Sequence, residues 1–572
     1  MQRMDVKRAI LYGRTVRHLS WRQVGWRVWN RARKRLGLDA RGTGPQAASA
    51  FSKDALGQLR HYADVWARHG APNAGALAAL HRGEITFLNR TVNASVGAPW
   101  DGHSSTPGAP PLPRLWLYHL HAFDHVVELC LHARNETSRE LVLGWISDWI
   151  AANPVGGDIA WDAYPLSCRL MNWSLAAATL GVDSEAMRRS MLWQAQYLME
   201  HLERDIEGNH LVKNAAALWV AGRVLGANHL HSHLLDEQLR EQLLADGGHY
   251  ERTPRYHLQV LQDCMLCLAV TAEPPPFLNE AVRRMLEFLA AVCHEDGQVA
   301  LFGDTTQDEP SGETVLRVGA ELLGIPKPQP PQDQFALTAS GIFGLTALDG
   351  GSRLLVKAGP PGAPRQPAHA HGDALSFELS AGGVRVVVDT GVHGYAESPW
   401  RAYCRSTAAH NTVVVNGREQ LEAWDVFRVA RRYTMLHASV GKDAAGRPSF
   451  RGAYRAYQGH VHERTIVWRE EGFWLVVDRV TERGPLSARS FLRLLPDADV
   501  RVAGFGGSVV EGTGLYFPRF GEEARVRKVE LDILGKDTVT CGWGLFLAGA
   551  TMISPDTLAE LAESVLAEME SS

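Results

Sequence analysis

The spacing of apolar residues changes at a stretch rich in proline and glutamine, residues 326–334. Before it, from about residue 114 to residue 298, apolar residues recur three and four positions apart, as they do on one face of a helix. After it, short apolar runs are separated by glycine, as strands are. A chain that changes period in this way is expected to fold as a helical domain followed by a β domain.

The half before this stretch contains a series of amphipathic runs with short breaks. Gly181 and Gly297 each follow a run, at the position where glycine commonly ends a helix. Many helices joined by short links indicate a bundle, a solenoid or an (α/α) toroid, and periodicity does not choose among them. The expected helices cover 116–132, 138–152, 165–180, 184–204, 210–224, 234–244, 254–270 and 278–294.

The half after the linker has the pattern of a large antiparallel β-sandwich. A last run, 556–569, is acidic and amphipathic and predicts a helix. The predicted organisation is a basic N-terminal segment at 1–50, a helical domain at 51–330, and a sandwich domain with its C-terminal helix at 335–572. The expected strands cover 342–348, 353–357, 375–379, 384–389, 412–415, 462–468, 474–480, 490–494 and 526–534.

Composition argues against several classes of protein. With 572 residues the chain can hold two or more domains, and a formal net charge of −4 gives no general attraction for nucleic acid. The seven cysteines are scattered and odd in number, unlike a disulfide framework. Cys264 and Cys267 lie in an apolar helical run and are expected to be buried thiols. The sequence has no Walker A loop, dinucleotide-binding glycine motif or Gly-x-Ser-x-Gly elbow.

The first 45 residues are strongly basic. Arg14, Arg17 and Arg22 interrupt the apolar residues there, so no signal peptide is recognised, and the compartment stays open between the cytoplasm and a periplasm reached by a non-standard route. Tryptophans lie between the arginines, at positions 21, 26 and 29. The segment is expected either to contact an anionic membrane or acidic polymer, or to pack its tryptophans on the body of the protein.

Histidines and carboxylates gather at strand edges between residues 366 and 416. His369 and His371 are two positions apart, so on a strand they face the same side. If Asp389 ends the neighbouring strand, it completes a site for a divalent cation with His371 and His410. The other interpretation is a set of hydrogen-bonded residues on the rim of a sheet.

Loops between the expected helices also carry polar and aromatic side chains. Asn209 and His210 stand at a helix start, where Asn209 would also serve as a cap. A later loop contains Tyr256 among basic residues, although such a tyrosine is more often a packing residue. Trp161 and Tyr164 lie on another loop, which suits a sugar ring or ordinary packing.

Taken in order, these segments resemble the heparinase II/III family of polysaccharide lyases and the similar alginate lyases. The resemblance implies an (α/α) toroid followed by an antiparallel β-sandwich, in agreement with the change of period. The matching segments are Leu115-Trp-x-Tyr118-x-Leu-His121, Tyr164-Pro-Leu-Ser167-x-Arg169-x-x-Asn172-Trp173, Asn209-His210, Glu251-Arg-x-Pro-x-Tyr256-His257, Phe302-Gly-Asp304, His369-x-His371-x-Asp373-x-x-Ser376-Phe377, Asp389-x-Gly391 and His410-Asn411-Thr412.

The resemblance also implies roles for individual residues. Asn209 and His210 match the family's substrate-binding pair. Tyr256 matches its catalytic tyrosine, with Tyr250 in the same segment, and His369 matches its catalytic histidine. The family's metal ligands match His371, Asp389 and His410, for which zinc is the best fit and manganese the alternative. Trp161 and Tyr164 are expected to contact the substrate, and basic residues would attract it and lower the pKa of the tyrosine: Lys213, Arg252, Arg255, Arg365, Arg401 and Arg405.

The implied reaction is a β-elimination on an anionic polysaccharide that contains uronic acid and resembles a glycosaminoglycan. The carboxylate beside C5 makes the C5 proton hard to remove, and Asn209 and His210 would hydrogen-bond that carboxylate. Tyr256 would protonate the leaving oxygen at C4 and could also act as base. His369 is the alternative base for the other C5 epimer, and the metal would hold its loop.

Two other functions stay open on the sequence alone. A glycoside hydrolase on the same scaffold would use carboxylates such as Asp162 and Asp304. A polysaccharide-binding protein without catalysis would be anchored by the basic N-terminus. Oligomerisation is also left open. Release of an ultraviolet-absorbing unsaturated uronate would distinguish the lyase from both alternatives.

Overall fold

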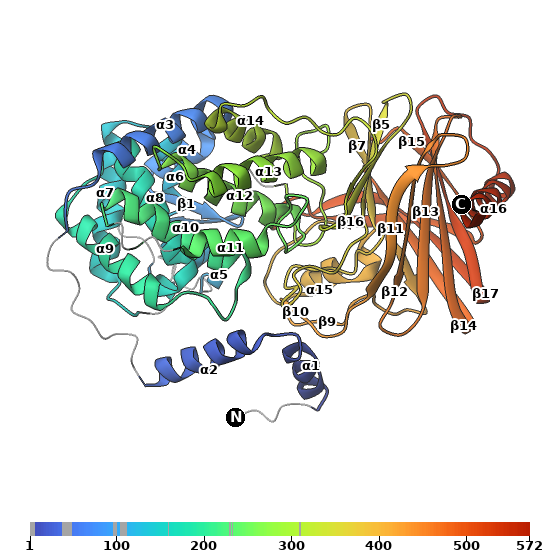
Figure 1. The fold of residues 1–572 in the computed structure, drawn as a ribbon, viewed down its shortest axis with the longest axis horizontal. Coiled ribbons are helices and arrows are strands. Elements are labelled where there is room, and N and C mark those ends of the chain that lie inside the picture. The colour runs from blue at the N-terminus through green and yellow to red at the C-terminus, as the bar shows by residue number, and fades with distance from the viewer. Residues whose placement is uncertain are drawn as a thin grey trace.

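The computed structural model describes residues 6–36, 48–94, 100–102, 111–157, 159–227, 230, 233–307 and 310–571. Figure 1 shows a helical lobe beside a β-rich lobe, with the helices α1 (Val6–Val16) and α2 (Trp21–Arg35) lying along one side of both. The order of the lobes along the chain is the predicted one, because the helical period ends where the sheet begins.

The helical lobe is centred on α8 (Ala163–Leu180) and α10 (Gly208–Val224), which pack against each other. Nearly every residue of α10 is buried, which is why its sequence is apolar on most faces. Around them lie α3 (Lys53–His69), α4 (Ala74–His81), α5 (Arg114–Ala122), α6 (Val126–His132), α7 (Glu136–Ala152), α9 (Glu185–Glu200), α11 (Leu234–Gln242), α12 (Pro254–Ala269), α13 (Pro276–Val292) and α14 (Gly312–Leu323).

The helical lobe differs from the prediction in three ways. The run expected at 116–132 is two helices, because Phe123 adopts a left-handed backbone conformation with φ 62° that ends α5. The helices α3, α4 and α14 are not among the expected helices. A small hairpin, β1 (Glu84–Phe87) and β2 (Arg90–Asn93), also occupies a region to which no element had been assigned.

The β lobe is built on long antiparallel strands. Its two longest, β14 (Phe473–Leu494) and β17 (Ala524–Leu547), pair along almost their whole lengths. The other strands are β3 (Phe335–Leu337), β4 (Ile342–Thr346), β5 (Ser352–Lys357), β6 (Phe377–Ala381), β7 (Val384–Val387), β8 (Val413–Val415), β9 (Ala423–Trp424), β10 (Arg428–Val429), β11 (Thr434–Lys442), β12 (Pro448–Arg455), β13 (Val461–Arg469), β15 (Val500–Phe505) and β16 (Ser508–Tyr516); α15 (Pro399–Arg405) and α16 (Pro555–Ser571) complete the lobe.

Strand β14 joins two runs that the sequence pattern separates. The runs expected at 474–480 and 490–494 belong to one strand, whose pairing with β17 shifts register between Thr481 and Pro485. Gly484 and Pro485 lie between the two runs, and the structure accommodates them as an irregularity within the strand. The final helix, α16, begins next to the predicted position.

The helices α1 and α2 form an arm, residues 6–35, that contacts both lobes. On the sandwich, Nη1 of Arg14 pairs with Oε1 of Glu422 at 2.8 Å. On the helical lobe, Nδ2 of Asn30 donates to Oδ1 of Asp205 at 3.0 Å. Ser20 caps α2 in a capping box with Gln23, which fixes the angle between the two helices.

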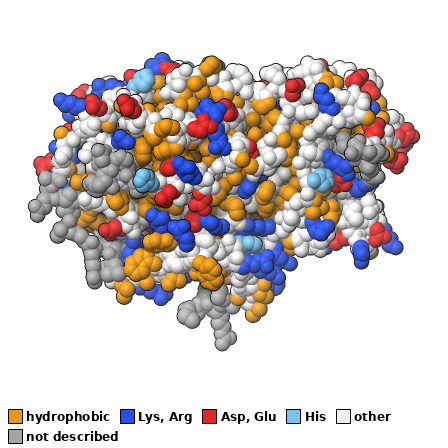
Figure 2. Space-filling model, viewed as in Figure 1, with side chains coloured by type: hydrophobic (Ala, Val, Ile, Leu, Met, Phe, Trp, Pro, Cys, Tyr) orange, Lys and Arg blue, Asp and Glu red, His pale blue; other side chains and the backbone are white. Residues whose placement is uncertain are grey.

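The arm turns several of its large apolar side chains away from the body. The side chain of Trp21 is 90% exposed and that of Trp29 is 49% exposed, whereas Trp26 lies half-buried with Arg204 over its ring. Figure 2 shows hydrophobic and basic side chains side by side along the edge where Figure 1 places the arm. Packing on the body therefore accounts for Trp26 but not for Trp21. Among the described residues, no helix has the length and apolar character needed to cross a bilayer.

Candidate active site

A single buried carboxylate joins the two domains at the site. Asp304 lies on the loop that follows α13 of the helical domain. Its Oδ2 accepts a hydrogen bond from Nδ1 of His369 at 2.9 Å, and its Oδ1 accepts one from Nε2 of His371 at 2.8 Å. The Arg401 guanidinium donates to both oxygens, at 2.9 Å for Nη2 to Oδ2. One carboxylate of the helical domain thus fixes three side chains of the sandwich.

The charge of Asp304 decides which nitrogen of His369 is free. Burial alone would raise the pKa of Asp304, but Arg401 and the hydrogen bonds from His369 and His371 hold that pKa well below its ordinary value. An ionised carboxylate only accepts hydrogen bonds, so Nδ1 of His369 carries a hydrogen. In neutral His369 the basic nitrogen is therefore Nε2.

Close approach of the two domains depends on the glycine before Asp304. Gly303 has φ 62°, and a Cβ there would lie 2.8 Å from the backbone oxygen of His369. Its backbone N–H donates to Oδ2 of Asp373 at 2.9 Å, while the N–H of Asp304 donates to the oxygen of His369 at 3.1 Å. A side chain at this position would push the domains apart.

Tyr256 of the helical domain and His369 of the sandwich lie in direct contact, with no gap of the size of a sugar between their rings. Tyr256 lies in the first turn of α12, and its ring stacks on that of His369 with centroids 3.7 Å apart and planes at 27°. Its hydroxyl shares a 3.0 Å hydrogen bond with the hydroxyl of Tyr395. Phe427 closes the other side, with its ring centroid 5.9 Å from that of His369. The helical domain thus brings a phenol, and the sandwich an imidazole, to one point.

The environment of Tyr256 corrects one expectation. Burial, with the nearby carboxylate of Asp304, raises the pKa of Tyr256 well above its usual value, although Tyr395 and Arg401 act in the other direction. The expectation that basic neighbours lower this pKa is therefore wrong for the free protein. A phenol in this environment stays protonated, and so it is suited to donate a proton.

Tyr250, the other tyrosine of the segment, has a different environment. Its hydroxyl accepts a hydrogen bond from the backbone N–H of Gly208 at 3.0 Å, at the start of α10. Gly208 and the preceding Glu207 both have positive φ, so this hydroxyl supports a sharp entry into the helix. Tyr256, and not Tyr250, stacks on His369.

Asn209 is oriented by a carboxylate of its own domain. Its Nδ2 donates to both oxygens of Glu251, at 3.1 and 3.0 Å, and its backbone N–H donates to Oε1 at 3.1 Å. The expected donation by Asn209 to a substrate carboxylate is therefore not available in this arrangement. The buried atom without a partner is Oδ1, which accepts hydrogen bonds and suits a carboxyl group that carries a proton.

His210 is held by a second carboxylate. Its Nδ1 is 2.8 Å from Oε1 of Glu203, and its ring lies 4.6 Å from that of Tyr164. Burial lowers the pKa of His210, but Glu203 outweighs it and the net shift is upward. A protonated His210 can therefore donate through Nε2 to a carboxylate beside Tyr164.

Two arginines expected at the substrate are used within the protein. Arg252 donates to the backbone oxygens of Gly362 at 2.6 Å and Ala339 at 3.2 Å, which braces the helical domain against the sandwich. Arg405 is buried and donates to the backbone oxygen of Val426 at 3.0 Å. Burial, with Arg401 nearby, lowers the pKa of Arg405 to about 10. Both side chains hold loops in place.

The remaining expected contacts divide between core and site. Trp161 is buried, stacks edge-on against Tyr197 at 5.0 Å and donates to the oxygen of Asn153, so it belongs to the core. Arg255 is half-buried in the first turn of α12, next to Tyr256. Tyr164, beside His210, is at the site.

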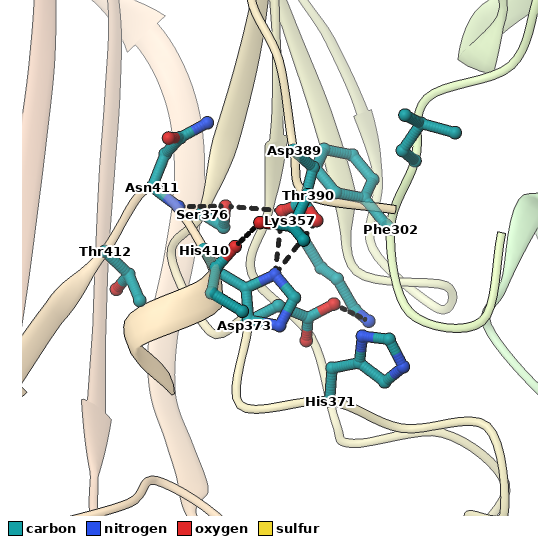
Figure 3. Close-up of polar contacts among 12 residues, drawn as sticks. Phe302, Lys357, His371, Asp373, Ser376, Asp389, Thr390, His410, Asn411 and Thr412 are labelled. Carbon is teal, nitrogen blue, oxygen red and sulfur yellow. Dashed lines mark hydrogen bonds and ion pairs between the residues drawn. The ribbon is translucent and has the colours of Figure 1, made fainter. Parts of the chain in front are cut away.

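The three predicted metal ligands lie close together, but they form hydrogen bonds with other protein side chains. The rings of His371 and His410 are 5.3 Å apart, and both oxygens of Asp389 face Nδ1 of His410, at 3.0 and 2.9 Å (Figure 3). Among the described residues, no group of three or more histidines, cysteines or acidic residues is arranged to hold a metal ion. Buried atoms without a partner are Nδ1 of His371, Nε2 of His410 and Oδ1 of Asp373.

Sequence reasoning gave no role to Tyr395, Glu251 or Phe427. Glu251 stood inside a motif that carried the family resemblance, so its position was a usable signal. Tyr395 and Phe427 lie on sandwich loops without a motif. Docking of the domains brings Tyr395 to Tyr256, whereas the fold of the sandwich loops brings Phe427 to His369.

Comparisons with known proteins agree with this architecture. The model described as "Heparinase II/III N-terminus" matches residues 118–318, and "Heparinase II/III-like, C-terminal" matches residues 329–540. A heparin-sulfate lyase of Pedobacter heparinus is 22% identical over 418 residues, which cover 64% of this chain and 60% of that protein. FtsZ-localized protein C of Caulobacter vibrioides is 25% identical over 348 residues, covering 56% and 58%.

Solved structures show the same fold. A crystal structure of heparinase III superposes with a TM-score of 0.66 at 15% identity, covering 89% of this chain and 87% of that one. The predicted toroid followed by an antiparallel sandwich is thereby confirmed. The chain spans 60% or less of the length of the curated relatives that it matches.

Proposed function

The chain belongs to the heparinase II/III family, and from that premise we propose that it is a polysaccharide lyase. Its substrate would be an anionic polysaccharide that contains uronic acid and resembles a glycosaminoglycan, cleaved by β-elimination to leave an unsaturated uronate end. The observation that carries the proposal is the stacking of Tyr256 on His369, with ring centroids 3.7 Å apart. His210 is linked to the same helix, because its ring lies beside that of Tyr164, whose hydroxyl accepts from Gln259 of α12.

Each residue has a step that its environment supports. His210, charged beside Glu203, donates to the uronate carboxylate and can pass that proton to it as negative charge moves onto the carboxyl oxygens. Oδ1 of Asn209 then accepts a hydrogen bond from the protonated carboxyl group. Nε2 of His369 takes the C5 proton, because Asp304 holds its Nδ1. The protonated phenol of Tyr256 then gives its hydrogen to the leaving oxygen at C4.

For the hydrolase alternative, neither of the two carboxyl groups suggested by the sequence, Asp162 and Asp304, is free. Asp304 has both oxygens occupied by His369, His371 and Arg401, and it stays ionised. Asp162 accepts from Arg114 and Tyr118, both at 2.7 Å. A glycosidase needs one carboxyl group free to protonate and another free to attack or activate water.

A substrate panel tests the lyase proposal. Purified protein is incubated with hyaluronan, chondroitin, heparan sulfate and alginate while absorbance of the unsaturated uronate is followed. We expect the chromophore to appear with at least one glycosaminoglycan and to vanish in Tyr256→Phe. Reducing ends without the chromophore would favour a hydrolase, and binding of polymer without any cleavage would favour the non-catalytic alternative.

We also propose a divalent cation, zinc by preference and manganese as the alternative. The support is the pair of buried nitrogens without partners, Nδ1 of His371 and Nε2 of His410, which are the donors that zinc takes. Asp389 does not fit as a direct ligand here, because it faces Nδ1 of His410, and we assign it the orientation of that ring. Metal analysis should find about one ion per chain; a fully active, metal-free preparation would reject the site.

The outward face of the arm is proposed to contact an anionic membrane surface. Trp21 and Trp29 are the aromatic anchors, and basic side chains on the same helices would meet lipid phosphates. Sedimentation with vesicles that contain phosphatidylserine should recover the protein, and Trp21→Ala/Trp29→Ala should leave it in solution. Self-association of the protein without vesicles, abolished by the same change, would assign this face to a second copy of the chain.

A further inference from the structure

A strongly basic pocket of about 530 Å³ lies between the arm and the two domains. The arm supplies one wall through α2, the helical domain contributes Asp205, and the sandwich contributes Arg365–Pro367 and the loop around Phe427. Its charged lining consists of Arg27, Arg31, Lys34, Arg365, Arg428 and Arg432 against only Asp205 and Asp425.

The two carboxylates of the pocket are already engaged. Oδ1 of Asp205 accepts from Asn30 at 3.0 Å, and Oδ2 of Asp425 accepts from Arg428 at 2.9 Å. Arg365 is paired outside the lining, with Glu207 at 3.0 Å and Glu241 at 2.9 Å. The excess of positive charge therefore rests on the other arginines of the lining and on Lys34. The pocket keeps an excess of cations around an open space.

Several of these cations have no carboxylate partner. Arg31 and Lys34 are exposed and form no hydrogen bond or ion pair with any described residue. Arg27 donates to the backbone oxygen of Asp205 and to the amide oxygen of Gln366. Arg432 donates to backbone oxygens only, and its Nε is buried without a partner. Guanidinium groups left in this state bind carboxylate or sulfate oxygens strongly.

The pocket adjoins the pair of residues proposed for catalysis. Phe427 lines it, and the same ring lies 5.9 Å from the ring of His369. Pro367, also in the lining, precedes His369 by two residues. A sugar in the pocket would therefore be a neighbour of the sugar that meets the polar edges of the stacked Tyr256 and His369 rings.

The arm lies outside the segments that define the family. The family models match from residue 118 onward, whereas the arm covers residues 6–35. Arg27, Arg31 and Lys34 therefore lie outside the residues that the family models match.

We propose that the arm and the sandwich loops together form an anion-binding subsite for a carboxylate or sulfate group on the sugar next to the cleaved bond. The identity of the polymer rests on the proposed function, but the pocket and its charge do not. Binding here would hold the chain on one side of the Tyr256–His369 pair and set the register of cleavage.

The test compares two double variants of the full-length protein that remove the same charge. Arg31→Ala/Lys34→Ala takes two cations out of the pocket. Arg8→Ala/Arg35→Ala takes two exposed cations from the same arm but outside the pocket lining. Labelled hyaluronan and heparan sulfate oligosaccharides are used for binding by fluorescence anisotropy and for cleavage, with thermal melts as the check on folding.

We expect the pocket variant to raise Kd and KM by about tenfold, with kcat within about twofold, and the control variant to change neither. Equal losses with both ligands identify the bound group as a carboxylate, and a loss only with heparan sulfate identifies it as a sulfate. Unchanged binding, or an equal loss in the control variant, would overturn the subsite.

The outcome is separable from that of the proposed function. If the wild-type protein binds oligosaccharide but releases no chromophore, the lyase proposal fails, and a tenfold weaker Kd in the pocket variant alone still supports the subsite. If cleavage occurs and the pocket variant matches the wild type in both Kd and KM, the subsite fails while the lyase stands.

Discussion

The two walls of the gap between the domains are held in different ways. On the helical wall, Asn209 is oriented by Glu251 and His210 by Glu203, both carboxylates of the same domain. On the sandwich wall, His369 is oriented by Asp304, which belongs to the helical domain. The first wall is complete when one domain has folded, whereas the second is complete only when the domains have docked.

In addition to Asp304, the contact between the domains contains other buried polar side chains. Glu378 of β6 accepts from Nε2 of His294 at 3.0 Å and from the N–H of Leu301 at 3.1 Å. Arg385 of β7 donates through Nε to Oδ2 of Asp296 at 2.8 Å. Such a network costs desolvation but allows few alternative positions, so it fixes how His369 meets Tyr256.

Asp304→Asn should give the largest effect, because it removes the charge on which the sandwich wall depends. The amide would leave the buried Arg401 guanidinium without its partner, which costs about 3–5 kcal/mol in the free energy of unfolding. Turnover should fall by at least about 10³-fold, since His369 loses its orientation. Chemical denaturation and chromophore release measure the two effects.

Glu203→Gln is the matched change on the helical wall. It removes one carboxylate charge beside His210 but leaves the contact between the domains intact. We expect a loss of about 1 kcal/mol in stability. If it destabilises the protein as much as Asp304→Asn does, the distinction between the two walls is wrong.

Tyr256→Phe should remove the proton donor from the helical wall without disturbing either wall. The lost hydroxyl bonds only to that of Tyr395, so stability should change by less than about 1.5 kcal/mol. Chromophore release should fall by about 10²–10⁴-fold. Tyr250→Phe should have the opposite pattern. It should lower stability, because the start of α10 loses a hydrogen bond, and leave the rate of chromophore release unchanged. Equal rates in the two variants would mean that the tyrosine is misassigned.

The same contrast explains which features of the fold and of the site could be predicted from the sequence. The helical period, the change at residues 326–334 and the motif at Asn209–His210 are local signals, and each corresponds to an element of the structure. On the helical wall, Glu203 lies seven residues from His210, but Glu251 lies 42 residues from Asn209. The Asn209–His210 motif could therefore be anticipated, whereas the carboxylate that orients Asn209 could not. Glu251 lies five residues before Tyr256 and fell within a recognised segment.

The features of the site that could not be predicted depend on contacts between segments far apart in the sequence. Asp304 precedes His369 by 65 residues and Arg401 by 97, so its role as their common partner leaves no periodic trace. The raised pKa of Tyr256 likewise follows from burial at the contact between the domains. Arg405 was expected to contact the substrate, but it is buried. Its burial depends on how the loops of the sandwich fold, which the sequence pattern does not reveal.

His369 and His371, two residues apart on the sandwich wall, should separate turnover from stability. His371 is fully buried, whereas His369 faces the gap and keeps some exposure. We expect His371→Ala to lower the free energy of unfolding by about 1–3 kcal/mol, and His369→Ala to lower it by less while abolishing chromophore release. Denaturation midpoints and rates for both variants decide this, and equal losses of stability would show that their roles are misassigned.

Acid should destabilise the helical domain before the sandwich. Burial lowers the pKa of His121, His125 and His257 to about 3, and that of His249 to about 4, against 6.5 in the unfolded chain. Because the unfolded domain binds more protons below pH 6.5, stability is complete above that pH and falls as pH drops toward 4, by at most about 1.4 kcal/mol per histidine and pH unit.

The sandwich holds fewer such histidines away from the candidate metal ligands, with His460 lowered to about 4. Hydrogen exchange at pH 7 and pH 5 should therefore show protection lost first in α5, α6 and α12, which carry or adjoin these histidines. His257→Gln, which removes one of the buried imidazoles, should reduce the acid sensitivity of these helices even if it costs stability at pH 7. Loss of protection first in β14 and β17 would contradict the assignment, because the pH-sensitive groups would then lie on the other side of the gap.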